Sequence, residues 1–192
     1  MDETHTTQEN NIVLGDQAGR DIINNTINLY ASDGSQPTPM GRLVEKFRKE
    51  RQNDTQFHET LEILKHFAQP ISGEDIAGLE AKLRVSGREG LLHFAQQTKE
   101  LFTKKLVEHQ FSEAAQEIHA YLLAEVYTRF HLEVFPSIQR GASPEIVTTL
   151  VLQRVIQPVQ ALLDENVLRL FSTEINGMLY YLTGNCHIKW TP

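Results

Sequence analysis

The chain has 192 residues and a formal net charge of −7, and 40% of its residues are hydrophobic. This composition is typical of a soluble globular protein with one main domain, and it disfavours general nucleic-acid binding. The single cysteine, Cys186, excludes a disulfide framework within the chain. The first ten residues are too polar for a signal peptide, and no apolar run is long enough for a membrane helix. A cytoplasmic location, with no membrane partner, is therefore the default expectation.

Residues 1–38 differ in composition from the rest of the chain, since a polar start precedes an Asn-rich segment at 11–30 and a linker. The β-branched and aromatic side chains of 11–30, broken by Gly and Asn, predict a β-type arm of short strands. Strands of this size are not stable alone. Either they join other copies of the arm in a homo-oligomer, or they pack on the body, where they could pair with the tail at 187–190. The residues expected at this interface are Gly15, Gly19, Arg20, Asp21, Ile22, Ile23, Asn24, Ile27, Asn28 and Leu29.

From residue 39 onward, apolar residues recur at helical spacing. Ser112 and Ser143 are expected as helix N-caps, with Pro144 at the first position of the second of these helices. Pro136 is expected to end one helix and Pro158 to kink or end another, because proline has no N–H to donate. Residues 39–192 are therefore predicted to form a mainly α, bundle-like domain with a short strand-like tail.

The helical region contains one candidate metal site. His58, Glu62 and His66 are spaced four residues apart on a helix expected to begin at Asn53 or Asp54. Such a face could hold the metal ion of a hydrolase. The favoured interpretation is an ordinary solvated face, since no further ligand motif accompanies it. We therefore expect no metal and no cofactor, and a metal-dependent hydrolase remains the alternative.

Two further patterns admit a functional interpretation. Cys186 and His187 are neighbours on the strand-like tail, so their side chains point to opposite faces and do not form a nucleophile–base pair. No catalytic residue is expected, and the protein is not expected to be an enzyme. Residues 42–51 are rich in basic side chains that could bind a nucleic acid or an acidic partner. The favoured interpretation is a solvated helix face, which makes nucleic-acid binding a further alternative. The basic residues are Arg42, Lys46, Arg48, Lys49 and Arg51.

Two short stretches resemble proteins of bacterial conflict and antiviral defence systems. The sequence GDQAGRDI at residues 15–22, followed by Asn24 and Asn25, resembles the "GDxAGRDI-N" arms of such proteins. The sequence LTGNCHIKW at residues 182–190 resembles the end of C-terminal domains from ABC-three-component systems. We call Gly184, Asn185, Cys186, His187 and Trp190 the terminal motif.

This resemblance implies a recruitment or assembly domain without catalysis of its own. In those systems an ATPase and a small middle component work with an effector that carries such a domain. The expected partners are therefore further copies of the chain and an ATPase, middle component or effector protein. Family members usually carry an effector ahead of the domain, whereas here the arm follows the first ten residues directly. We therefore expect a stand-alone member or an excised domain.

Overall fold

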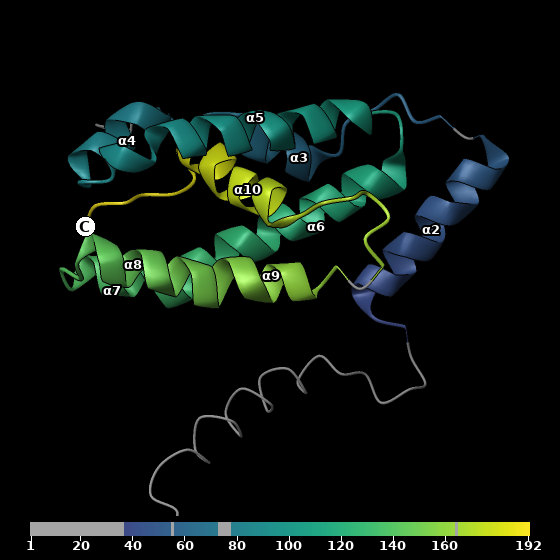
Figure 1. Cartoon of the computed structure of the whole chain (residues 1–192). Helices are drawn as coiled ribbons and strands as arrows, with labels where there is room; N and C mark the ends of the chain where they lie inside the picture. Colours follow the sequence, from purple (N-terminus) through teal and green to yellow (C-terminus); the bar gives the residue numbers. More distant parts are fainter. Residues whose placement is uncertain (1–36, 55, 73–77, 164) are drawn as a thin grey trace, which may run out of the picture. The chain divides into compact units, whose positions relative to one another are not determined.

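A computed structural model describes residues 37–54, 56–72, 78–163 and 165–192 (Figure 1). Every regular element in these ranges is helical, which confirms the predicted mainly α fold class. The predicted β-type arm and each of its interface residues, Gly15 to Leu29, lie outside the described residues.

The helices follow one another from residue 39 to residue 184. They are α2 (Pro39–Asn53), α3 (Glu62–Ala68), α4 (Leu79–Val85), α5 (Leu92–Glu108), α6 (Glu113–Arg129), α7 (Phe135–Gln139), α8 (Pro144–Leu150), α9 (Gln157–Ala161) and α10 (Ser172–Gly184). A 3₁₀ turn at Glu89–Leu91 leads into α5. The predicted caps are confirmed at α6, where Ser112 Oγ accepts Ala115 N at 3.1 Å, and at α8, where Ser143 Oγ accepts Ile146 N at 3.5 Å.

Helix α10 lies at the centre of the bundle. It packs along α5 on one side and against α6 and α9 on another (Figure 1). Gly177 makes the close approach to α5 possible, because a Cβ at this position would clash with Thr98 O and lie 2.7 Å from Phe102 Cβ. Phe102, Ile175 and Met178 are fully buried at or beside this crossing. The core of the domain is therefore built around a helix contact that only glycine permits.

Pro136 was expected to end a helix and Pro158 to kink or end one, but neither proline ends its helical run. A π-helical turn over Phe130–Val134 joins α6 to α7, and another over Val151–Ile156 joins α8 to α9. Pro136 and Pro158 follow directly, each at the second position of the next helical segment. A wider turn accommodates the missing N–H and the bulk of the proline ring, so the chain stays helical past each proline. The two π-helical turns also pack against each other.

Candidate protein interaction site

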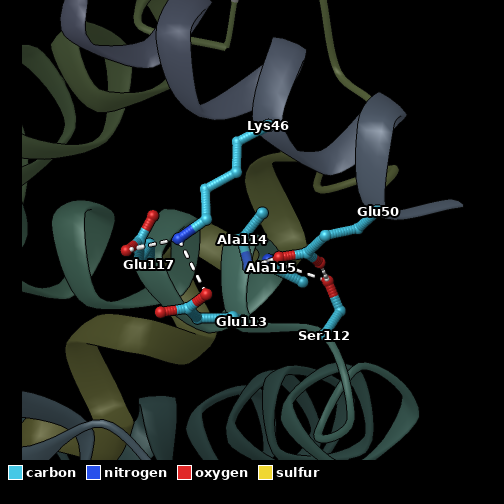
Figure 2. Close-up of polar contacts among 7 residues, drawn as sticks. All are labelled: Lys46, Glu50, Ser112, Glu113, Ala114, Ala115 and Glu117. Carbon is cyan, nitrogen blue, oxygen red and sulfur yellow. Dashed lines mark hydrogen bonds and ion pairs between the residues drawn. The ribbon is translucent and has the colours of Figure 1, made fainter. Parts of the chain in front are cut away.

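The N-terminal end of α6 holds α2 in place through a shared polar contact (Figure 2). Glu50 of α2 accepts Ala114 N at 2.9 Å through Oε1 and Ser112 Oγ at 2.7 Å through Oε2. A carboxylate here satisfies a free N–H group of the first helical turn and interacts favourably with the helix dipole. Glu50 therefore adds a second cap to α6 from another helix.

Lys46, one turn before Glu50, makes the second half of this contact (Figure 2). Its Nζ lies 3.0 Å from Glu113 Oε2 and 2.9 Å from Glu117 Oε1. Burial alone would lower the pKa of Lys46, but the hydrogen bonds to Glu117 and Glu113 outweigh this effect and raise it. We call the contacts of Lys46 and Glu50 with residues 112–117 the α2 clamp.

Beneath the clamp, α2 presents a stripe of buried apolar residues, namely Met40, Val44 and Phe47. This arrangement changes the interpretation of the basic segment at 42–51. Lys46 points to α6, Arg48 forms ion pairs with Glu45 and Glu165, and the Arg51 guanidinium lies 6.0 Å from the centre of the Phe47 ring. The five basic residues therefore do not form one open cationic face for phosphate groups.

The terminal motif holds the far end of α3. Asn185 Nδ2 donates to Phe67 O at 2.9 Å, and His187 Nε2 donates to Gln69 O at 3.2 Å. Ile71 N donates in return to Asn185 O at 3.2 Å. The last carbonyls of a helix lack partners within it, so two side chains 118 residues away along the chain supply the missing donors. Burial and the nearby His66 lower the pKa of His187.

The tail after α10 is a turn and not the predicted strand. Cys186 N donates to Thr183 O and His187 N donates to Leu182 O, the two bonds of a Schellman motif. The residue that closes this motif adopts the left-handed conformation, and Cys186 does so with φ of +65°. Helix α10 ends at Gly184, and Asn185 is its C-cap. The turn, and not the alternation of a strand, therefore sets the directions of the Cys186 and His187 side chains.

Trp190 anchors the end of the tail in the core. Its Nε1 donates to Thr183 Oγ1 at 3.1 Å, and its ring lies 5.1 Å from that of Phe130. The Arg88 guanidinium lies over the indole, 5.0 Å from the ring centre. The sequence pattern points to Trp190 but not to Arg88, because the two residues lie about half the chain apart in the sequence.

The candidate metal ligands do not share a helix face. Helix α3 begins at Glu62, so His58 precedes it and packs against Phe111 with ring centres 5.7 Å apart. Glu62 pairs with Lys65, and the His66 ring lies 5.0 Å from that of His187. Within the described residues, no group of three or more His, Cys, Asp and Glu side chains is placed to hold a metal ion.

Three exposed apolar side chains lie on α4 and α5, the helices that precede and follow Arg88. Val85, at the end of α4, is 54% exposed, and Phe94, in the first turn of α5, is 43% exposed. Leu101, seven residues after Phe94 on the same face of α5, is 41% exposed. The Phe94 ring contacts Tyr180, whose ring stacks on Trp190. We call the three exposed side chains, Val85, Phe94 and Leu101, together with the largely buried Arg88, the α5 face.

Comparison with known proteins identifies one family. Residues 78–190 match the family model described as C-terminal domain 9 of the ABC-three component (ABC-3C) systems. The match spans more than half of the chain and includes α4 to α10, whereas α2 and α3 precede it. No curated protein and no solved structure shows a significant match. Among the described helices, none combines the length and apolar character that spanning a membrane requires.

Proposed function

The chain belongs to the family of C-terminal domain 9 of the ABC-three-component systems, and we propose that it is a non-enzymatic assembly and recruitment component of such a system in bacterial defence. In this proposal, residues 11–30 drive self-association. The helical domain docks onto an ATPase, middle component or effector protein through the α5 face. The observation that carries the proposal is the family match over residues 78–190.

The α2 clamp supports the assembly role. Helix α2 follows the linker and lies outside the matched region, yet Lys46 and Glu50 fix it to α6 inside that region. The terminal motif fixes α3 to the same domain. The linker therefore leads into a helix that is fixed to the rest of the domain. Because self-association raises the effective concentration of attached domains, copies joined by their arms would present several docking surfaces at once.

The α5 face supports the docking role. Two large apolar side chains, Phe94 and Leu101, lie two turns apart on this helix and remain substantially exposed. Exposed apolar side chains on one face of a helix are a feature of protein interaction sites. Aromatic residues and arginine are also enriched among the side chains that dominate binding energy. Phe94 contacts Tyr180, whose ring stacks on Trp190, and Trp190 in turn lies under Arg88.

Self-association is tested by deleting residues 1–38 and measuring molar mass by light scattering. We expect the intact chain to be oligomeric and the shortened chain to have a lower mass. The helical circular dichroism should be the same for both, because residues 39–192 contain all the described helices. An unchanged mass after deletion would exclude the arm as the oligomerisation element.

Docking is tested by co-expressing the intact chain with the ATPase and the middle component of its own system and purifying the complex. Phe94→Lys should abolish co-purification, since it places a charge on the α5 face. Leu132→Lys is the matched control, because Leu132 is 72% exposed in the π-helical turn after α6. Failure of the intact chain to retain either component would contradict the docking role.

A further inference from the structure

The turn between α4 and α5 places a cation at an unusual position. Gly87, with φ of +68°, closes a Schellman motif in which Gly87 N donates to Arg84 O and Arg88 N donates to Leu83 O. This turn directs Arg88 back over Trp190. Arg88 is only 6% exposed, and the indole covers one face of its guanidinium.

The guanidinium of Arg88 is buried with fewer hydrogen-bond acceptors than its N–H groups require. Its Nη1 donates to Ser86 O at 2.9 Å, whereas its Nε is buried without an acceptor. A buried guanidinium is normally matched by a carboxylate, since it carries five N–H donors in a planar fork. Glu145 is the carboxylate that interacts with Arg88 at longer range, and its side chain is hydrogen-bonded to Ser143.

A second buried cation adds to the positive charge of the same corner. Lys82, on α4, is 4% exposed, and its Nζ donates to Ile188 O at 3.2 Å. Lys82 and Arg88 therefore both contact the segment 188–190, one through a carbonyl and one through the indole. Within the described residues, neither cation forms an ion pair with a carboxylate. This local charge contrasts with the net charge of −7 for the whole chain.

We propose that Arg88 is the recognition point for a carboxylate side chain of the protein partner that docks on the α5 face. This inference rests on the proposed docking function and adds the chemistry of the partner, an acidic segment with neighbouring apolar residues. The carboxylate accepts N–H groups of the Arg88 fork, while Val85 and Phe94 provide apolar contacts at its rim. An Arg–carboxylate pair of this kind gains strength from the partly desolvated setting and from its fixed geometry.

Trp190 provides a direct reporter, because it is the single tryptophan of the chain and lies under Arg88. The intact chain is titrated with an acetylated, amidated hexaglutamate peptide at low ionic strength, and the emission of Trp190 is followed. We expect a saturable change, and no change with the matched hexaglutamine peptide. Because the chain is acidic overall, binding of an acidic peptide requires a local cationic site.

Two substitutions and one control assign the signal. Arg88→Gln should weaken hexaglutamate binding by about tenfold or more, and Arg88→Lys should also weaken it, because lysine keeps the charge but loses the planar fork. Arg84→Gln removes the same charge from an exposed site on α4 and should leave affinity within about twofold. Circular dichroism of each variant establishes that it is folded.

Several outcomes would overturn the assignment. Equal binding by Arg88→Gln and the unchanged chain would exclude Arg88 as the site. Binding of inorganic phosphate without binding of hexaglutamate would exclude a protein carboxylate. If Arg88→Gln still co-purifies with the ATPase or middle component as well as the unchanged chain, the docking function stands and the Arg88 site does not. If hexaglutamate binds at Arg88 but no component co-purifies, the site stands and the docking function does not.

Discussion

Helices α10 and α2 are both packed on the central part of the domain, but by opposite means. Helix α10 is buried along most of its length and meets α5 at Gly177, without room for a side chain. Helix α2 buries one stripe of three residues and relies on the half-exposed polar contacts of the clamp. The α10 contact is buried and apolar, so its stability depends on side-chain volume. The α2 contact is partly exposed and polar, so its stability depends on charge. The fold therefore depends mainly on α10, and α2 is the element whose attachment can be adjusted.

The largest effect should come from breaking the α10 contact. Gly177→Ala should destabilise the domain by about 3 kcal/mol, because the new methyl group meets the backbone of Thr98, which cannot move aside cheaply. Urea unfolding followed by circular dichroism measures the loss. Gly90→Ala is the control, because a Cβ at Gly90 meets no atom within 4 Å. Equal stability of Gly177→Ala and the unchanged chain would show that α5 and α10 are farther apart than described.

The next effect concerns His119 of α6, where the two regions meet. The His119 ring contacts Phe102 of α5 and lies 6.0 Å from the ring of His109, which in turn contacts Phe47 of α2. Burial, together with the smaller effects of the positive charges of His109 and Lys105, lowers the pKa of His119 to about 3, and Glu108 acts in the opposite direction. Burial also lowers the pKa of His109; Glu108 acts in the opposite direction, and the positive charges of Lys105 and Arg51 add to the lowering.

Because the folded pKa of His119 lies below its unfolded value of 6.5, the unfolded chain binds the extra proton. Stability should therefore fall as the pH drops below 6.5, by about 2 to 3 kcal/mol at pH 4.5 from this residue. Urea unfolding at pH 7 and pH 4.5 measures it. His119→Phe removes the titrating group, so the stability that this variant loses between pH 7 and pH 4.5 should be smaller by about 2 to 3 kcal/mol. A loss of the same size in the variant would mean that other groups carry the pH dependence.

A third effect compares two ways of ending a helix. Gly87 and Gly141 close the Schellman motifs after α4 and α7, whereas Cys186 closes the one after α10. A β-branched side chain is strained at positive φ, so Cys186→Val should destabilise the domain by about 2 kcal/mol. Cys186→Gly should cost less than about 1 kcal/mol, because relief of strain offsets the loss of a buried side chain. Thermal unfolding of both variants tests this order, and a more stable valine variant would contradict it.

The sequence predicted the features that depend on neighbouring residues. Ser112 and Ser143 cap helices because an N-cap bond spans three residues, so the capping side chain and its partner are close in the sequence. The outcome at Pro136 and Pro158 was not predictable in this way. Proline rules exclude a regular α-helix but do not decide between an end and a π-helical turn, and packing between the two turns favours continuation.

The candidate site was predictable only in part. The tail sequence identified the family, and Asn185, His187 and Trp190 do contact other parts of the domain. Their partners lie more than 100 residues away for Asn185 and His187, and no local pattern predicts such a pairing. No local pattern predicts the partners of Arg88 and Glu50 either. In the sequence, Glu50 is an ordinary helix carboxylate, and only its contact with α6 gives it a capping role. The basic segment at 42–51 was noted because its charge could bind a nucleic acid or an acidic partner. In the structure, this helix matters because Lys46 and Glu50 attach it to α6.

The smallest effect tests the clamp itself. Glu50→Ala should cost about 1 to 2 kcal/mol, because it removes the second cap of α6 and leaves Ala114 N without its acceptor. The control is Glu45→Ala, which removes an exposed carboxylate of the same helix paired with Arg48 and should cost less than about 0.5 kcal/mol. Limited proteolysis should cleave the Glu50→Ala chain near α2 before any other helix, while α5 to α10 resist. Cleavage at equal rates in both variants would mean that the apolar stripe alone holds α2. The attachment of α2 would then depend on buried apolar contacts, as that of α10 does, and not on charge.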